Sequence, residues 1–137
     1  MSKNRNGMIK DPDGNCIWYQ NNQRHREDGP AYEHTNGYRA WYRNGKRHRE
    51  DGPALEYANG DREWWGNGER HRDDGPAVEH VNGSCEWWIN GKLHREDGPA
   101  AEWADGICEW WINGKIYAKE EYEQAVFVYK WGLSVDA

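Results

Sequence analysis

The chain has 137 residues and a net charge of −6, and 36% of its residues are hydrophobic while 31% are charged. Its bulky side chains are almost all aromatic, with 10 Trp and 8 Tyr against 1 Phe, so burial must come from rings that each hide about 150–250 Å². This aromatic content excludes a disordered chain, and the negative charge without any Lys/Arg-rich run excludes nucleic acid as the expected partner.

Residues 1–7 are expected to be a flexible N-terminus. The first residues, MSKNRNGMIKDPDG, contain no apolar segment of the kind found in secretory signals. No stretch of the sequence approaches the roughly 18 apolar residues that a membrane-spanning helix needs. We therefore expect a cytoplasmic protein without membrane insertion, and one located in the host cytoplasm if the source is a virus.

Residues 8–116 consist of a repeat with a period of 23 residues. Each complete copy begins with His-Arg-(Glu/Asp)-Asp-Gly-Pro-Ala, and a worn first copy keeps Asp13-Gly14 and Trp18 in register. A fixed period of this length is the signature of a repeat architecture. The worn copy spans 8–24, and the four complete copies, which align without gaps, span 25–47, 48–70, 71–93 and 94–116.

Each copy is expected to form two strands and two tight turns. In the third copy we predict a strand over Ala77–Val81, a turn at Asn82-Gly83 and a return strand over Ser84–Ile89. A second turn at Asn90-Gly91 leads into Lys92–Arg95, and Asn-Gly is the strongest signal for a type I′ hairpin turn. The Asp-Gly-Pro step then interrupts the ladder. The fold class predicted is an all-β tandem repeat of stacked hairpins, a single-layer or coiled β-meander or solenoid.

Two aromatic ladders follow from strand periodicity. Along Ser84–Ile89, alternation places Trp87 on one face and both Glu86 and Trp88 on the other. One ladder is expected to be core and the other a partly exposed face, and the sequence does not say which. The first ladder is Trp18, Trp41, Trp64, Trp87 and Trp110, and the second is Tyr19, Tyr42, Trp65, Trp88 and Trp111.

The His-Arg-(Glu/Asp)-Asp-Gly motif could suggest metal ligands or acid–base pairs. Equivalent residues of successive copies should lie roughly 10 Å apart, whereas zinc ligands lie about 2 Å from the metal. We therefore expect a structural ladder in which Asp accepts turn N–H groups and orients His, with no metal and no catalytic residue. Its members are His25, His48, His71, His94, Asp28, Asp51, Asp74 and Asp97.

The same spacing governs two further sets of residues. Cys16, Cys85 and Cys108 occupy one repeat position, so they are too far apart for a disulfide and should be free thiols. The glutamate and arginine ladders, which include Glu33 and Arg26, are expected to pair across strands. Neither set predicts a catalytic centre or a cofactor.

Residues 117–137 abandon the repeat and are expected to cap its C-terminal end. A helix is predicted over about 118–130, with Tyr122 and Tyr129 on one face. The composition of residues 126–131, VFVYKW, favours a strand, so a shorter helix followed by a strand is the alternative. The edge at the worn N-terminal copy could pair with a second chain, which leaves a monomer or an edge-paired homodimer.

The motif WxNGKxH, followed by a glycine-containing turn, a short strand and (D/N)G at 23-residue spacing, resembles MORN repeats. It is most similar to a divergent, antitoxin-like variant and to HREDGPA arrays typical of phages and large DNA viruses. The usual YxGxW strand is replaced by xxEWW, and HREDGP stands where HGxG is expected. The resemblance implies a hairpin stack used for protein interaction, tethering or scaffolding, and it implies no catalytic residue.

The expected function is non-catalytic binding of a protein partner through an acidic, aromatic β-surface. Flat rings flanked by carboxylates suit cationic side chains, and a phage or viral accessory factor acting on a host protein would fit. The alternative is a carbohydrate-binding module whose Trp ladders stack on a glycan. The candidate residues are Trp65, Trp88, Trp103, Trp111, Glu86 and Glu109.

Overall fold

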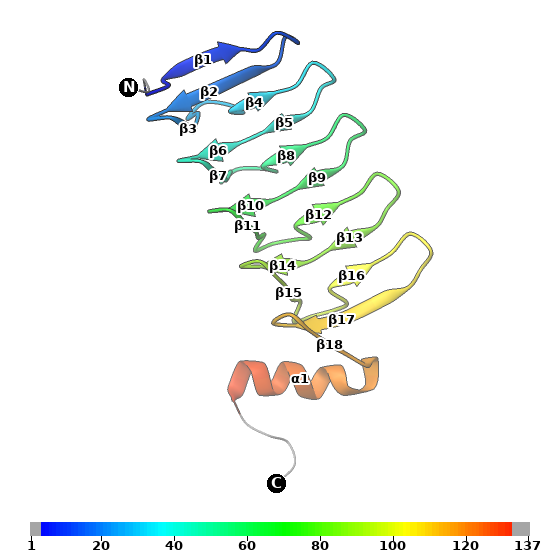
Figure 1. Ribbon diagram of the computed structural model, residues 1–137. Helices are drawn as coiled ribbons and strands as arrows, with labels where there is room; N and C mark the ends of the chain where they lie inside the picture. The colour runs from blue at the N-terminus through cyan, green and yellow to red at the C-terminus, as the bar shows by residue number, and fades with distance from the viewer. Residues whose placement is uncertain (1–3, 133–137) are drawn as a thin grey trace.

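The computed structural model describes residues 4–132, in which 12 strands form one antiparallel sheet and the remaining strands form three two-stranded hairpins (Figure 1). The strands are β1 (Gly7–Lys10), β2 (Cys16–Gln20), β3 (Gln23–Arg24), β4 (Tyr32–Glu33), β5 (Arg39–Ala40), β6 (Tyr42–Arg43), β7 (Lys46–Arg47), β8 (Leu55–Glu56), β9 (Arg62–Glu63), β10 (Trp65–Gly66), β11 (Glu69–Arg70), β12 (Val78–Glu79), β13 (Cys85–Glu86), β14 (Trp88–Ile89), β15 (Lys92–Leu93), β16 (Ala101–Glu102), β17 (Cys108–Ile112) and β18 (Lys115–Tyr117). The main sheet has 12 strands, in the order β1-β2-β4-β5-β8-β9-β12-β13-β16-β17-β18, with β3 paired to β2. The predicted all-β meander of stacked hairpins is confirmed.

Each of the first three complete copies adds two strands to the main sheet and forms one hairpin beside it, whereas in the fourth copy β17 is undivided and pairs with β18 within the main sheet. In the third copy β12 pairs with β13, and β13 pairs in turn with β16 of the next copy. The N–H of Trp87 donates to Ala100 at 2.6 Å, and the carbonyl of Trp87 accepts the N–H of His94 at 3.0 Å. The return strand predicted over Ser84–Ile89 is divided at Trp87, and β14 pairs with β15 outside the main sheet.

The two Asn-Gly turns of a copy differ in conformation. At the side hairpin Asn90 and Gly91 have φ of 48° and 78°, as a type I′ turn requires. At the main-sheet hairpin φ is positive at Gly83 (95°) but not at Asn82, and the N–H of Gly83 donates to the carbonyl of His80 at 3.0 Å. This is a type I turn closed by a left-handed glycine, so the type I′ prediction is confirmed at Asn90-Gly91 and wrong at Asn82-Gly83.

Small side chains fill the places where copies meet. Ala54 is fully buried, its N–H donates to Glu63 and its carbonyl accepts the N–H of Trp41 at 2.7 Å. The largest fully buried side chain is Leu55. A single-layer sheet has room only for such small groups between its copies, so the larger rings lie on its two faces. The buried alanines of this row are Ala31, Ala54, Ala77 and Ala100.

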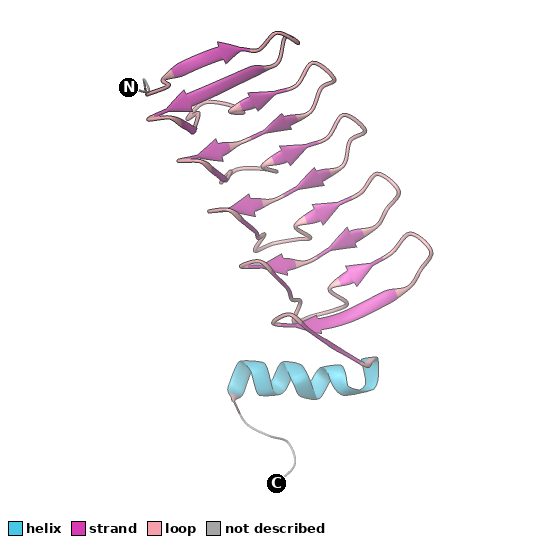
Figure 2. Cartoon of the chain, viewed as in Figure 1, coloured by secondary structure: helices cyan, strands magenta, loops and turns pink. Residues whose placement is uncertain are grey.

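A helix, α1 (Lys119–Trp131), covers the C-terminal end of the sheet (Figure 2). Its Tyr122 is 6% exposed, and the ring lies 4.9 Å from that of Trp110. The helix ends at Gly132, which has φ of 66° and donates its N–H to Val128, a common helix ending. The predicted capping helix is confirmed, and the alternative in which VFVYKW forms a strand is wrong.

The N-terminal end of the sheet is formed by β1, paired with β2. The guanidinium of Arg5 lies 5.1 Å from the ring of Tyr19, and Asn6 accepts the N–H of Asn21 at 2.9 Å. Of the segment expected to be flexible, residues 1–3 lie outside the described residues, as do residues 133–137 of the capping segment. No helix within residues 4–132 has the length and apolar character needed to cross a membrane.

Candidate functional site

The residues expected to bind a partner lie together on one face of the sheet. The indole N–H of Trp88 donates to Glu86 at 3.3 Å, and that of Trp111 donates to Glu109 at 2.9 Å. The other oxygen of Glu109 accepts the indole N–H of Trp103 at 3.2 Å. All five side chains are half-buried, so each ring exposes part of its surface while its polar edge is satisfied.

The same face continues along the preceding copies, where strand alternation places more aromatic residues and a row of arginines. The guanidinium of Arg70 connects the preceding copies with the C-terminal part of the face, since it lies 5.6 Å from the ring of Trp65 and 5.2 Å from that of Trp88. We call this surface the aromatic face. It consists of Arg24, Tyr32, Tyr38, Tyr42, Arg47, Tyr57, Glu63, Trp65, Arg70, Glu86, Trp88, Trp103, Glu109 and Trp111.

Glu63 is the most enclosed carboxylate of the aromatic face, at 7% exposed. It accepts the indole N–H of Trp65 at 3.0 Å, the hydroxyl of Tyr57 at 2.8 Å and the Nε–H of Arg70 at 3.1 Å. Burial, followed by the hydrogen bond to Glu63, raises the pKa of Tyr57 far above its ordinary value. Three donors therefore fix this glutamate, and the Tyr57 hydroxyl stays protonated.

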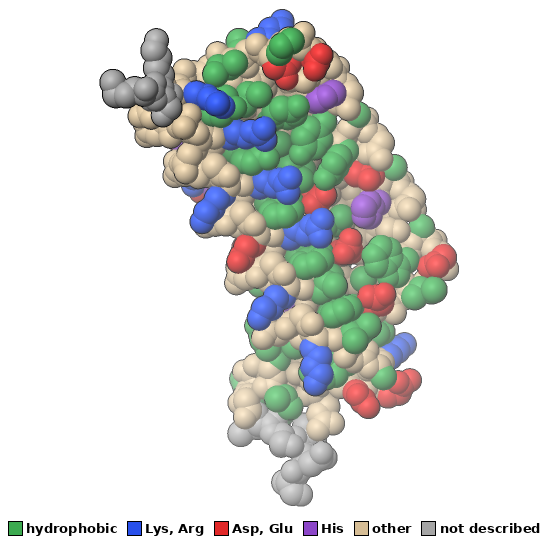
Figure 3. Space-filling model, viewed as in Figure 1, with side chains coloured by type: hydrophobic (Ala, Val, Ile, Leu, Met, Phe, Trp, Pro, Cys, Tyr) green, Lys and Arg blue, Asp and Glu red, His purple; other side chains and the backbone are tan. Residues whose placement is uncertain are grey.

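The arginine row is the part of the face that the sequence analysis missed. Arg24 lies 5.1 Å from the ring of Tyr32, and Arg47 lies 4.9 Å from that of Trp65. Figure 3 shows Lys and Arg side chains following one another along the face, among hydrophobic ones. The signal was present in the sequence, because Arg24, Arg47 and Arg70 end successive copies while Leu93 and Ile116 end the last two. Guanidinium groups thus occupy the N-terminal part of the surface that was expected to be acidic and aromatic.

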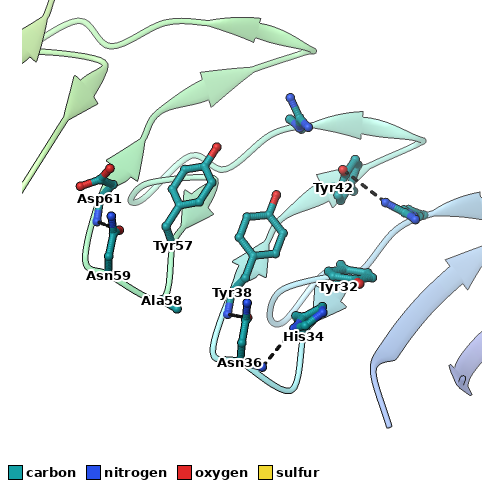
Figure 4. A pocket seen from close by; sticks show the side chains of 11 residues that line it. Tyr32, His34, Asn36, Tyr38, Tyr42, Tyr57, Ala58, Asn59 and Asp61 are labelled. Atoms are coloured by element: carbon teal, nitrogen blue, oxygen red, sulfur yellow. Dashed lines mark hydrogen bonds between the residues drawn. The ribbon is translucent and has the colours of Figure 1, made fainter. Parts of the chain in front are cut away.

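A depression of about 600 Å³ opens on this N-terminal part. Tyr38 stands between two other tyrosines, with its ring centroid 5.9 Å from that of Tyr32 and 5.3 Å from that of Tyr57. Figure 4 shows Tyr38 and Tyr57 side by side with their hydroxyls pointing the same way, and Tyr42 beyond them. Burial raises the pKa of Tyr38. The depression thus has aromatic walls and protonated phenols.

The opposite face carries the other Trp ladder, and there the first four rings lie under arginines, whereas the ring of Trp110 packs against Tyr122 of α1. The guanidinium of Arg72 lies 3.8 Å from the centre of the Trp64 ring. Its nitrogens also donate to the carbonyl of Pro76 at 3.0 Å and to Glu79 and Asp74, both at 3.3 Å. The same stack forms with Arg26 on Trp18, Arg49 on Trp41 and Arg95 on Trp87.

This stack explains the His-Arg-(Glu/Asp)-Asp-Gly motif as structural. A Cβ at Gly75 would come within 2.9 Å of the Arg72 guanidinium carbon, closer than packed atoms approach, so glycine leaves room for the arginine. The predicted pairing of the glutamate ladder with the arginine ladder is present, since Arg72 contacts Glu79 at 3.3 Å, but it does not run across strands, because the residues opposite Glu79 in register are Arg62 and Cys85. The chain's own arginines therefore cover the tryptophan rings of this opposite face.

The histidines of the motif join one copy to the next. Nδ1 of His71 accepts the backbone N–H of Asn90, in the side turn that follows, at 3.0 Å. Its Nε2 lies 2.9 Å from Asp73, whereas Asp74 accepts from Arg72. The expectation that the second acidic residue orients the histidine is therefore wrong, because Asp74 binds the Arg72 guanidinium and the first acidic residue, Asp73, lies beside the ring. Equivalent bonds run from Asn44 to His25, from Asn67 to His48 and from Asn113 to His94.

The remaining candidate groups also have structural positions. Cys16 and Cys85 are half-buried and Cys108 is exposed, and all three are free thiols. Within residues 4–132 no group of three or more His, Cys, Asp or Glu side chains is arranged to hold a metal ion. No protein-family model matches the chain, and a comparison with curated proteins finds no similar sequence.

Proposed function

We propose that this chain is a non-catalytic repeat protein that binds a protein partner through the aromatic face. The observation that carries the proposal is the way the exposed rings are held: Trp88 and Trp111 each donate to a glutamate of the same strand region. Side chains ordered before binding lose little entropy when a partner arrives. Trp, Tyr and Arg are also the residues that dominate binding energy at protein interfaces.

The C-terminal part of the face suits cationic side chains of the partner. Trp111 lies beside Glu109, and the copy-ending position that holds Arg70 earlier in the chain is Leu93 or Ile116 here. A lysine or arginine placed on the Trp111 ring would gain a cation–π contact and a carboxylate partner in Glu109.

The biological role that we propose for this binding is based on the repeat motif. The resemblance to MORN-type and HREDGPA arrays favours an interaction or tethering role, in a phage or viral accessory factor that acts on a host protein in the cytoplasm. Five hairpin copies in one stack give a stiff, extended surface of the kind that repeat proteins use for binding.

The test is affinity capture from host lysate with the wild-type chain and with the double variant Trp88→Ala/Trp111→Ala. The matched control is Phe127→Ala/Trp131→Ala, which removes two exposed rings of α1. We expect a retained protein whose affinity falls at least about tenfold in the Trp88/Trp111 variant and stays unchanged in the control. Failure to retain any protein, or equal loss in both variants, would count against the proposal.

Carbohydrate binding is the second candidate, favoured by the ring–carboxylate pairs of the aromatic face. A sugar ring can stack on Trp88 while its hydroxyls donate to Glu86. A glycan array showing selective binding that is lost in Trp88→Ala/Trp111→Ala would place this function above protein binding.

A further inference from the structure

The N-terminal part of the aromatic face contains two arginines that lack a carboxylate partner. Within the described residues, neither Arg24 nor Arg47 has a carboxylate oxygen within the 4.0 Å of an ion pair. The next arginine of the row, Arg70, is paired with Glu63 at 3.1 Å. Two adjacent guanidinium groups on a chain of net charge −6 are thus left without an opposite charge.

The phenol of Tyr42 holds these two arginines in place. The guanidinium of Arg24 lies 5.4 Å from the Tyr42 ring and donates to its hydroxyl at 3.4 Å. Arg47 stands directly opposite Tyr42 in the register of β6 and β7. Arg24 of β3 and Arg47 of β7 are therefore both neighbours of the Tyr42 ring. Both side chains are half-buried, so their positions are restricted before any ligand binds.

The depression beside them supplies an apolar surface and few competing charges. Its walls are the rings of Tyr32, Tyr38 and Tyr57, seen in Figure 4. One carboxylate, Asp61, lines its far end, but Asp61 accepts the N–H of Val81 at 2.9 Å and lies 3.1 Å from His80. These contacts lower the pKa of Asp61, so its carboxylate stays ionised, and the two arginines outweigh this single negative charge in the lining of the depression.

The tyrosine cluster departs from the repeat. The position of Tyr32 is Leu55, Val78 and Ala101 in the later copies, and that of Tyr38 is Asp61, Ser84 and Ile107. Positions that hold the stack together, such as the stacked arginines, recur in every complete copy. Residues that appear in one copy alone are not needed for stacking, which points to a role particular to this place in the array.

We propose that the pocket formed by Arg24, Tyr42, Arg47 and the three tyrosines binds an extended acidic segment of the protein partner. The inference rests on the proposed function and specifies its partner. Guanidinium groups bind carboxylates with paired N–H donors, and they do so while stacked on aromatic rings. Carboxylates of the segment bind Arg24 and Arg47, and its apolar atoms cover the tyrosines.

This arrangement also orients the partner. The N-terminal part of the face takes carboxylates, and the part around Trp111 and Glu109 takes cations. A partner segment therefore runs from acidic to basic along the array, because the reverse orientation would place like charges together.

The test uses fluorescein-labelled hexaglutamate, with hexalysine and hexaglutamine of the same length as comparisons, in anisotropy titrations of the full chain. The variant is Arg24→Gln/Arg47→Gln. The matched control is Lys46→Gln/Lys92→Gln, which removes the same charge from exposed side-hairpin strands. We expect saturable hexaglutamate binding that weakens at least about tenfold in the arginine variant and changes less than about twofold in the lysine control.

Several results would overturn the inference. These are absence of saturable hexaglutamate binding to the wild-type chain, equal weakening in the two double variants, or hexaglutamine binding as tightly as hexaglutamate. Circular dichroism of Arg24→Gln/Arg47→Gln checks that the variant folds, and Arg24→Lys/Arg47→Lys gives a second variant that keeps the charge. If host-protein capture is lost in Trp88→Ala/Trp111→Ala but intact in Arg24→Gln/Arg47→Gln, the proposed function stands and this inference fails.

Discussion

At the scale of single residues, the chain uses similar side chains for two purposes, and their surroundings separate them. The Trp64 ring lies under Arg72 on one face, while Trp88 and Trp111 lie on the other face with their N–H groups on glutamates. Strand alternation alone places Trp87 and Trp88 on opposite faces. It does not reveal which ladder the motif arginine covers, because that depends on how the Asp-Gly-Pro segment folds back on the preceding copy.

The stacked arginines should be sensitive to shape as well as charge. Arg72 and Arg62 both pair with Glu79, but Arg72 is also bound to Pro76 and Asp74. We expect Arg72→Lys to lower the free energy of unfolding by about 1–2 kcal/mol, since lysine cannot reproduce the planar, several-donor contact. Arg62→Lys, at an exposed site, should change it by less than about 0.5 kcal/mol. Urea unfolding followed by Trp fluorescence measures both, and equal effects would contradict the stacking argument.

His94 makes the array sensitive to acid. Its ring is buried, its Nδ1 accepts the N–H of Asn113, and burial lowers the pKa of His94 although Glu96 opposes the shift. Folding therefore favours the neutral ring, so its contribution to stability is complete above the ordinary pKa of 6.5 and is lost as the pH falls below it. We expect the urea midpoint to fall more between pH 7.5 and 5.5 in the wild-type chain than in His94→Asn. The same decrease in both chains would contradict this role.

At the scale of secondary-structure elements, the sequence predicted the existence and kind of each element better than its length. Asn-Gly or Asp-Gly marked both turns of every complete copy but did not distinguish the type I′ turn at Asn90-Gly91 from the bulged turn at Asn82-Gly83. The distinction depends on the strands that leave each turn. The return strand was likewise predicted without its division at Trp87, because alternation along one strand does not show that β14 pairs with β15 instead of with the main sheet.

The capping helix depends on one tyrosine. The hydroxyl of Tyr122 accepts the N–H of Gly98 and donates to the carbonyl of Arg95. Tyr122→Phe leaves both backbone groups unpaired under the helix, so we expect a loss of about 1–3 kcal/mol in the free energy of unfolding. Tyr129→Phe, whose side chain is 48% exposed, is the matched control and should change it little. Thermal unfolding followed by far-ultraviolet circular dichroism measures both variants.

At the scale of the whole molecule, the array is a line of copies in which each copy contacts its neighbours. The two differently charged parts of its aromatic face were not predicted, although the residues that cause them can be read in the sequence. That difference arises from side chains at a single repeat position, Arg in the early copies and Leu or Ile in the last two. These copy-ending side chains lie on the same face as the second aromatic ladder, and the pairing of the two strands in each side hairpin is what brings them there.

A linear array should also respond locally to damage. Ala77 is fully buried between the second and third complete copies, where its carbonyl accepts the N–H of Trp64 and its own N–H donates to Glu86. Ala77→Val overfills this site and should cost about 1–3 kcal/mol. Since copies are coupled mainly to their neighbours, we expect faster hydrogen exchange in β8 to β13, with little change in β1, β2, β17 and β18. Mass spectrometry of exchanged peptides measures this pattern, and equal acceleration along the whole chain would show that the array unfolds as one unit.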